Sequence, residues 1–193
     1  MIDFGISSGD IVHGVTEGAG STGVALSNQS DEDFCAWASF AKLLAAKGYR
    51  VLLFNYSSGS PDQETAAAAE HLRILGAQRV FLIGASKGAK SAIIAATEIR
   101  PLVTGVVSLS AERMLLRTDV LSYAQRLTVP VLFVTATSDE YGAADDTQAL
   151  YGAAASQDKL LMTVPGSDHG TALVRTSTHS EVVERILRFL SAH

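Results

Sequence analysis

Residues 80–91 place the strongest constraint on how this chain can fold. They hold an apolar run and a Gly-x-Ser-x-Gly pattern at 84–88, and they lead into a segment rich in Ala and Ile. This order predicts a buried strand, a sharp turn with Ser86 at its tip, and a helix. We expect Gly84 and Gly88 to be required, because a Cβ at either would clash where strand and helix pack closely. The Ser86 hydroxyl would then lie at the positive end of the helix.

The composition is typical of one globular domain, which we expect to span residues 1–193. The chain is 47% hydrophobic and 18% charged, and it is long enough for a single core. Its net charge of −5 argues against a nucleic-acid partner, because phosphate binding needs a basic surface. No apolar run reaches the roughly 18 residues of a membrane span. The first residues lack the pattern of a signal peptide, and the single cysteine, Cys35, allows no internal disulfide. We therefore predict a cytoplasmic protein without a membrane partner.

A strand-then-helix rhythm recurs along the chain and predicts a mostly parallel sheet with helices on both faces. Residues 7–10 are expected to form the turn of an N-terminal hairpin. The expected strands are 3–6, 10–16, 22–26, 50–56, the segment from residue 79 to Ser86, 102–109, 130–135 and 160–164. The expected helices are the segment from Ser30 to Gly48, 60–75, the segment after Ser86, 118–127, 142–155 and the segment after Thr178.

Three of these helices begin with residues that favour an N-terminus. Ser30 is expected to cap the first, with Asp33 at its third position, and Ser60 to cap the second. Thr178 and Glu181 have the spacing of a capping box for the last helix. Residues 110–129 leave room for one short helix and for no lid.

A serine hydroxyl becomes a good nucleophile only when an imidazole takes its proton, and a carboxylate must orient that imidazole. His169 lies just beyond the last expected strand, in a loop where Gly170 allows the chain to turn. His179, in the first turn of a helix, and the terminal His193 are expected to be solvated. We therefore predict that His169 is the base that serves Ser86.

Asp139 is the predicted orienting acid, because it follows the strand 130–135. The adjacent Glu140 remains an alternative. Asp145 and Asp146 fall inside the next helix and are expected on its solvated face. Asp168 is next to His169, and neighbours in a chain rarely turn their side chains toward each other.

An oxyanion hole needs two preorganised N–H donors. We expect them to be the backbone N–H groups of Lys87 and of Gln29, which follows the strand 22–26. Cys35 and Trp37 are expected to pack in the core. No His, Cys, Asp or Glu cluster has the spacing of metal ligands, so we expect neither a metal nor another cofactor.

The chain resembles small bacterial α/β-hydrolases of the serine-esterase or dienelactone-hydrolase-like type over nearly its whole length. The resemblance is carried by the pentapeptide 84–88, Asp139 after its strand, the triplet 168–170 and the segment 26–29. It implies an α/β-hydrolase fold with a mostly parallel sheet of about seven or eight strands, helices on both faces and no cap domain.

The resemblance also implies a serine hydrolase that cleaves small or soluble carboxylic esters through an acyl-enzyme on Ser86. An amidase or a thioesterase would use the same triad, and a non-catalytic module that binds a ligand or a partner would share the fold. Two features differ from the family. Many relatives have His-Gly where this chain has Ser27-Asn28, and dienelactone hydrolases carry a cysteine nucleophile where this chain has Ser86.

Overall fold

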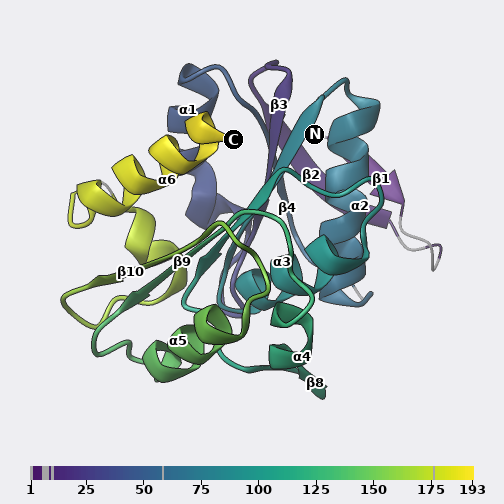
Figure 1. Ribbon diagram of the computed structural model, residues 1–193. Helices are drawn as coiled ribbons and strands as arrows, with labels where there is room; N and C mark the ends of the chain where they lie inside the picture. The colour runs from purple at the N-terminus through teal and green to yellow at the C-terminus, as the bar shows by residue number, and fades with distance from the viewer. Residues whose placement is uncertain (1, 6–8, 10, 58, 176) are drawn as a thin grey trace.

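A computed structural model describes residues 2–5, 9, 11–57, 59–175 and 177–193. Its centre is an eight-stranded sheet in the order β1-β2-β4-β3-β5-β6-β9-β10 (Figure 1). β2 pairs antiparallel with both β1 and β4, and the remaining pairs are parallel. The strands are β1 (Ile2–Gly5), β2 (Ile11–Glu17), β3 (Thr22–Ser27), β4 (Arg50–Phe54), β5 (Arg79–Ala85), β6 (Gly105–Leu109), β9 (Val131–Ala136) and β10 (Lys159–Val164).

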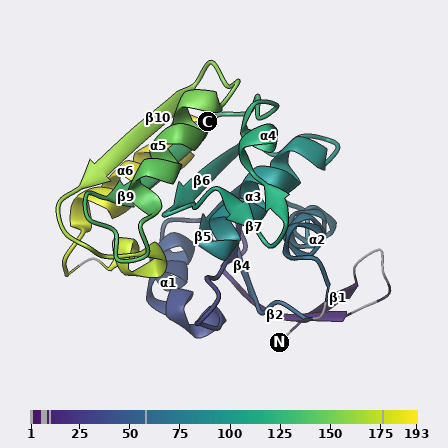
Figure 2. The same ribbon diagram turned by 90° about the horizontal axis from the view of Figure 1, so that it is seen from below.

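Helices cover both faces of this sheet, so the predicted α/β-hydrolase architecture is confirmed. α1 and α6 lie on one face of the sheet (Figures 1 and 2). α2, α3, α4 and α5 lie on the other face. The helices are α1 (Ala38–Ala46), α2 (Pro61–Ile74), α3 (Lys87–Glu98), α4 (Leu121–Ala124), α5 (Ala143–Ala153) and α6 (Ser180–Ala192), and the 3₁₀ helices are η1 (Phe34–Trp37) and η2 (Gly170–Val174).

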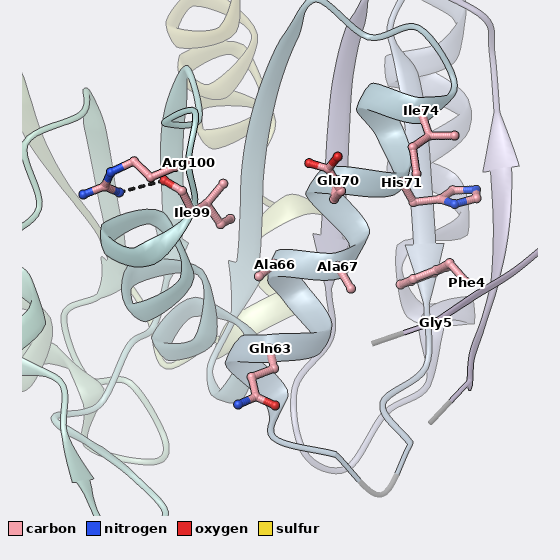
Figure 3. A pocket seen from close by; sticks show the side chains of 10 residues that line it. All are labelled: Phe4, Gly5, Gln63, Ala66, Ala67, Glu70, His71, Ile74, Ile99 and Arg100. Atoms are coloured by element: carbon pink, nitrogen blue, oxygen red, sulfur yellow. Dashed lines mark hydrogen bonds between the residues drawn. The ribbon is translucent and has the colours of Figure 1, made fainter. Parts of the chain in front are cut away.

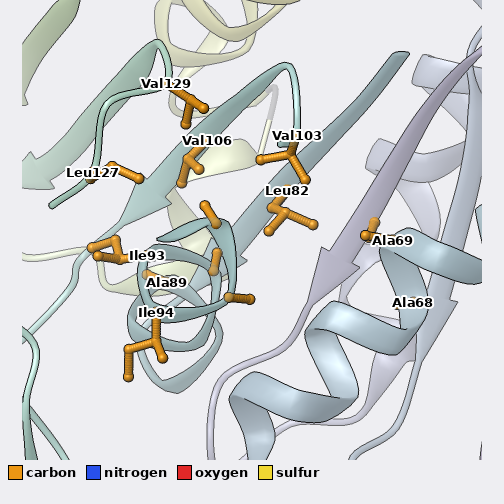
Figure 4. Close-up of a cluster of buried hydrophobic side chains, with 14 of the residues drawn as sticks. Ala68, Ala69, Leu82, Ala89, Ile93, Ile94, Val103, Val106, Leu127 and Val129 are labelled. Atoms are coloured by element: carbon orange, nitrogen blue, oxygen red, sulfur yellow. The ribbon is translucent and has the colours of Figure 1, made fainter. Parts of the chain in front are cut away.

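Alternate side chains of the central strands supply the two halves of the core. On β5, Leu82 faces α2 and α3, whereas Phe81 and Ile83 face α1 and α6. Figure 4 shows Leu82 beside Val106 and the helices that cover them. Leu82 is fully buried, and removing such a side chain from water contributes about 1.5–3 kcal/mol. This two-sided burial holds β5 in the middle of the molecule.

The N-terminal hairpin forms as β1 and β2, but its predicted turn at 7–10 lies outside the described residues except for Gly9. β6 is shorter than predicted, because the chain before Gly105 is irregular and leaves Leu102 exposed. Residues 110–129 hold a two-stranded ribbon, β7 (Met114–Leu115) and β8 (Thr118–Asp119), and then the short helix α4. This helix is shorter than the predicted 118–127, because Thr118 and Asp119 pair with β7. In the described part of the chain this segment forms no cap domain over the sheet.

Two predicted helix caps are wrong. Asp33 rather than Ser30 is the N-cap, since its carboxylate accepts from the Cys35 N–H at 2.8 Å and opens η1. Thr178 forms no capping box, because its hydroxyl donates to the Arg175 carbonyl, and α6 begins one residue after His179. The first helical segment therefore begins later than the capping pattern predicts, and Thr178 bonds a loop carbonyl in place of a helix end.

Ser60 is the N-cap of α2 as predicted, although its hydroxyl bonds the Asp62 carboxylate and no backbone N–H of the helix. Within the described ranges, no helix combines the length and the apolar character that a membrane span requires.

The glycines around Ser86 are required by close packing, as predicted. A Cβ on Gly84 would lie 2.1 Å from the Gly88 carbonyl oxygen, and a Cβ on Gly88 would lie 2.0 Å from the Ser27 carbonyl oxygen. Both clashes are with backbone, which cannot move aside as a flexible side chain can. The N-terminus of α3 therefore rests directly against the ends of β3 and β5.

Gly88→Ala should lower the free energy of unfolding by about 1–3 kcal/mol or more, because the new methyl group overpacks against the Ser27 carbonyl. Gly152→Ala in α5 is the matched control, since a Cβ there meets open space. It should leave stability unchanged or raise it by up to about 1 kcal/mol, because alanine favours helix over glycine. Urea denaturation of both variants tests this, and equal losses would contradict the packing argument.

Candidate active site

Ser86 lies at the turn between β5 and α3 with φ 49° and ψ −110°. A non-glycine residue rarely adopts a positive φ, and holding one there costs on the order of 1–3 kcal/mol. Two backbone hydrogen bonds secure the turn: the Ser86 N–H donates to the Leu109 carbonyl at 2.8 Å, and the Lys90 N–H donates to the Ser86 carbonyl at 3.1 Å. The tight turn aims the side chain away from the strand, at the edge where the parallel strands end.

His169 and Asp139 form a buried hydrogen-bonded pair at that edge. His169 Nδ1 lies 2.8 Å from Asp139 Oδ1 and 3.0 Å from Oδ2. Asp139 follows β9 and His169 follows β10, which are neighbouring parallel strands. The sequence-predicted acid and base are thus brought into contact.

Opposing effects set the pKa of Asp139. Burial of the carboxyl works to raise it, but hydrogen bonds from His169 and from the Ser110 hydroxyl, with the charge of His169, outweigh that burial. The Tyr141 N–H also donates to Asp139 Oδ1, at 3.0 Å. The pKa of Asp139 is therefore lowered, and the carboxylate is held ionised against the imidazole.

The other candidate acids are not paired with His169. Glu140 is exposed, and its N–H donates to the Ser167 carbonyl at 3.0 Å. Asp145 is exposed in the first turn of α5, whereas Asp146 accepts from the Arg113 N–H at 2.8 Å.

His179 and His193 are less solvated than predicted. The Asp168 carboxylate lies 2.8 Å from the buried His179 ring, so Asp168 orients a histidine, but not its neighbour in the chain. The His193 ring lies edge-on to Phe189, with the ring centroids 4.8 Å apart.

Ser86 and His169 line the same cavity, whose volume is about 230 Å³. Its other lining residues are Ser30, Asp31, Glu112 and Tyr141. The Ser86 hydroxyl donates to Glu112 Oε2 at 3.3 Å. Ser86 and His169, both of which the structure describes, form no hydrogen bond with each other. The Ser86 hydroxyl therefore bonds Glu112 and not the imidazole.

Sequence reasoning missed Glu112. It follows β6 by three residues, so the rule that located Asp139 beyond β9 also applies to it. Lys90 Nζ lies 2.8 Å from Glu112 Oε2, and the lysine side chain is only 9% exposed. Lys90 is one helical turn after Ser86 on α3. The available signal was the position of Glu112 shortly after a predicted strand, but that position does not reveal the contact with α3.

The two candidate oxyanion donors occupy suitable backbone positions. Lys87 is the first residue of α3, where an N–H has no acceptor within the helix. Gln29 follows β3, and its side-chain oxygen accepts from the Thr171 N–H at 3.0 Å. A Cβ on Gly170 would lie 2.0 Å from that oxygen, and Gly170 has φ +56°. The loop after β3 and the loop of His169 are therefore closely packed together.

The side chains of Lys87, Trp37 and Cys35 lie in three different environments. Lys87 Nζ lies 4.3 Å from the centroid of the Tyr56 ring, and burial lowers the pKa of Lys87, against the opposing charge of Glu64. Trp37 is fully buried, as predicted. Cys35 is exposed, so the prediction that it packs in the core is wrong: the irregular 3₁₀ turn leaves the thiol outside.

A larger cavity, of about 450 Å³, lies between α2, β1 and the end of α3, where Phe4, His71 and Arg100 border it (Figure 3). α3 has 12 residues, so its two ends are about 18 Å apart, and Ser86 is at the other end. No hydrogen-bonded carboxylate–histidine pair borders this cavity within the described residues. The chemistry therefore points to the smaller cavity.

The folded-state pKa of Asp139 lies below its unfolded value of about 3.9. Its ionised form therefore stabilises the fold at pH values above the unfolded pKa. This contribution is lost as pH falls through the folded-state pKa. Asparagine cannot ionise, so Asp139→Asn should be most destabilising relative to wild type above about pH 5 and less so toward about pH 3. Urea denaturation across that range measures the difference, and a gap that widens on acidification would contradict the assignment.

Known proteins with a similar sequence or structure indicate the fold of this chain. A family model described as PhoPQ-activated pathogenicity-related protein matches residues 102–192, and no curated protein sequence matches the chain. Among solved structures, an esterase of Pyrococcus furiosus is similar with a TM-score of 0.87 and 17% identity, over 99% of this chain and 91% of that one.

Two other solved structures are also similar. A Paleococcus ferrophilus monoacylglycerol lipase matches with a TM-score of 0.81 and 17% identity, over 94% of this chain and 99% of that one. An enol-lactonase from Burkholderia xenovorans matches with a TM-score of 0.77 and 13% identity, over 98% and 100%. With its strand order and its strained serine turn, the chain has the α/β-hydrolase fold.

Proposed function

We propose that this protein is a serine hydrolase that cleaves small or soluble carboxylic esters through an acyl-enzyme on Ser86. One observation carries the proposal: Ser86, on its strained turn, borders the same cavity as His169, and His169 is held by ionised Asp139. A nucleophile, a base and an orienting acid in chain order Ser, Asp, His are the parts that acyl transfer needs.

The Asp139 contact fixes the imidazole for this reaction. With Nδ1–H donating to the carboxylate, Nε2 carries the lone pair that can accept a proton. After the Ser86 hydroxyl turns from Glu112 to Nε2, Oγ attacks the ester carbonyl carbon and its proton passes to the imidazole. The alkoxide leaving group then takes that proton, and a water activated by His169 hydrolyses the acyl-enzyme.

The backbone N–H groups of Lys87 and Gln29 are the proposed donors to the oxyanion. Lys87 N–H lies at the positive end of α3, where developing negative charge is favoured. The contact of Gln29 with Thr171 would hold the second donor at a fixed distance from the His169 loop.

The substrate class rests on two further observations. The similar solved structures include an esterase, a monoacylglycerol lipase and an enol-lactonase, all of which act on ester bonds by name. The described chain carries no cap domain, so the site has no shelter for an extended acyl tail. Amide and thioester cleavage would use the same groups, and the cytoplasmic location remains a prediction.

A non-catalytic binding module is the competing function. The observation in its favour is that the Ser86 hydroxyl bonds Glu112 instead of His169. A fluorophosphonate probe separates the two functions, because it reacts only with an activated serine.

Ser86→Ala should abolish fluorophosphonate labelling while preserving the fold, because it removes the hydroxyl that the proposal assigns as the nucleophile. Ser30→Ala is the matched control, since Ser30 borders the same cavity and lies on no strained turn. Intact mass spectrometry and circular dichroism provide the readouts. Labelling that survives in Ser86→Ala, at Ser91 or Ser110 for example, would overturn the assignment.

Asp139→Asn should lower kcat/KM for a p-nitrophenyl ester by at least about 10²-fold, because an amide can favour the wrong imidazole tautomer. Glu140→Gln should lower it by less than about tenfold, since Glu140 is exposed and its side chain makes no contact with His169. Steady-state kinetics on both variants decides the matter. Losses in the reverse order would make Glu140 the orienting acid.

A further inference from the structure

The cavity that holds Ser86 has an unusual charge for a site that binds uncharged esters. Two carboxylates, Asp31 and Glu112, border it, and none of its described lining residues is a lysine or an arginine. An anionic substrate would meet like charge on two sides. The distribution of charge around each carboxylate decides whether this field reaches a ligand.

Glu112 is fixed with its charge toward the cavity. Its Oε2 atom lies 2.8 Å from Lys90 Nζ, and the lysine side chain is 9% exposed against 28% for Glu112. The lysine is therefore behind the carboxylate, and the negative end of the ion pair is the end that a ligand meets. Loss of this contact would leave a buried lysine unpaired, so Glu112 is held in place.

Among the described residues, no salt bridge pairs Asp31 with a cation. It is exposed, and its Oδ1 atom accepts from Gln29 Nε2 at 3.0 Å, which is a neutral donor. The ammonium group of Lys87, the residue after Ser86, lies outside the cavity lining. Lys87 Nζ lies over the Tyr56 ring, and Lys87 is absent from the cavity lining.

An aromatic ring borders the same space. Tyr141 is 60% exposed, and its ring centroid lies 4.5 Å from that of His169. The face of a tyrosine ring attracts cations, by about 0.5–1 kcal/mol at exposed sites. Carboxylates beside an exposed aromatic ring are the groups that bind an ammonium ion.

We propose that this cavity binds esters that carry an ammonium group, with the cation held by Glu112, Asp31 and the Tyr141 ring next to Ser86. The inference names the substrate class of the proposed hydrolase, so it rests on the proposed function wherever the ligand is called a substrate. Binding of the cation itself depends only on the cavity.

The test compares two isosteric esters that differ by one charge, acetylcholine and 3,3-dimethylbutyl acetate. Their affinities for the Ser86→Ala protein are measured by NMR titration at low ionic strength, so that hydrolysis does not interfere. Acetylcholine should bind at least about fivefold more tightly, which corresponds to one exposed ion pair or cation–π contact. Equal affinities, tighter binding of the neutral ester, or no shift of cavity resonances with acetylcholine would overturn the proposal.

Adding Glu112→Gln to Ser86→Ala should reduce the preference for the cation to within about twofold. Glu140→Gln is the matched control, because it removes a nearby charge that does not border the cavity. If Glu112→Gln fails to fold with Lys90 unpaired, the double change Lys90→Met and Glu112→Gln, together with Asp31→Asn alone, replaces it. A preference that survives the removal of both carboxylates would contradict the assignment.

Hydrolysis by the wild-type protein is measured separately with the same two esters. A protein that prefers the cation in the binding assay but cleaves neither ester would refute the hydrolase and retain the cation site. A protein that cleaves both esters with no binding preference would retain the hydrolase and refute the cation site.

Discussion

The structure depends on the direct backbone contact between α3 and the ends of β3 and β5. Without side chains at Gly84 and Gly88, the first turn of the helix reaches the Ser27 carbonyl. That contact leaves no room for a relaxed connection, so Ser86 is forced to a positive φ and its hydroxyl projects from the sheet edge. The nucleophile candidate is therefore positioned by packing, and the surrounding core, buried on both faces of β5, supplies the energy that holds the strain.

The remaining parts of the site are linked to this centre by polar contacts between loops. The Gly170 N–H donates to the Ser110 hydroxyl at 3.1 Å, and that hydroxyl also helps to lower the pKa of Asp139. The Thr171 N–H donates to Gln29, across 142 residues of sequence. Loops that follow four strands, β3, β6, β9 and β10, thus set each other's positions. The His169 ring is held by this network as well as by its carboxylate partner.

The sequence predicted best where a residue's position follows from the sheet alone. Asp139 and His169 were expected to meet because each follows a strand and parallel strands bring their carboxyl ends to one edge, and the two side chains are in contact. The capping prediction at Ser30 failed because the helical segment begins later, with Asp33 as its N-cap, and the one at Thr178 failed because its hydroxyl bonds a loop carbonyl. Glu112 was missed because its contacts depend on how the loop after β6 folds back toward α3, which no local pattern encodes.

The position of Glu112 connects the two proposals physically. Its carboxylate accepts from both Lys90 and the Ser86 hydroxyl, so in the proposed reaction it would compete with the imidazole for the hydroxyl proton. A ligand cation that pairs with Glu112 would draw charge away from Oε2 and weaken its hold on the hydroxyl. Ser86 would then turn more readily toward His169. In this arrangement, the charge that selects the substrate would also release the nucleophile, and a neutral ester would lack that second effect.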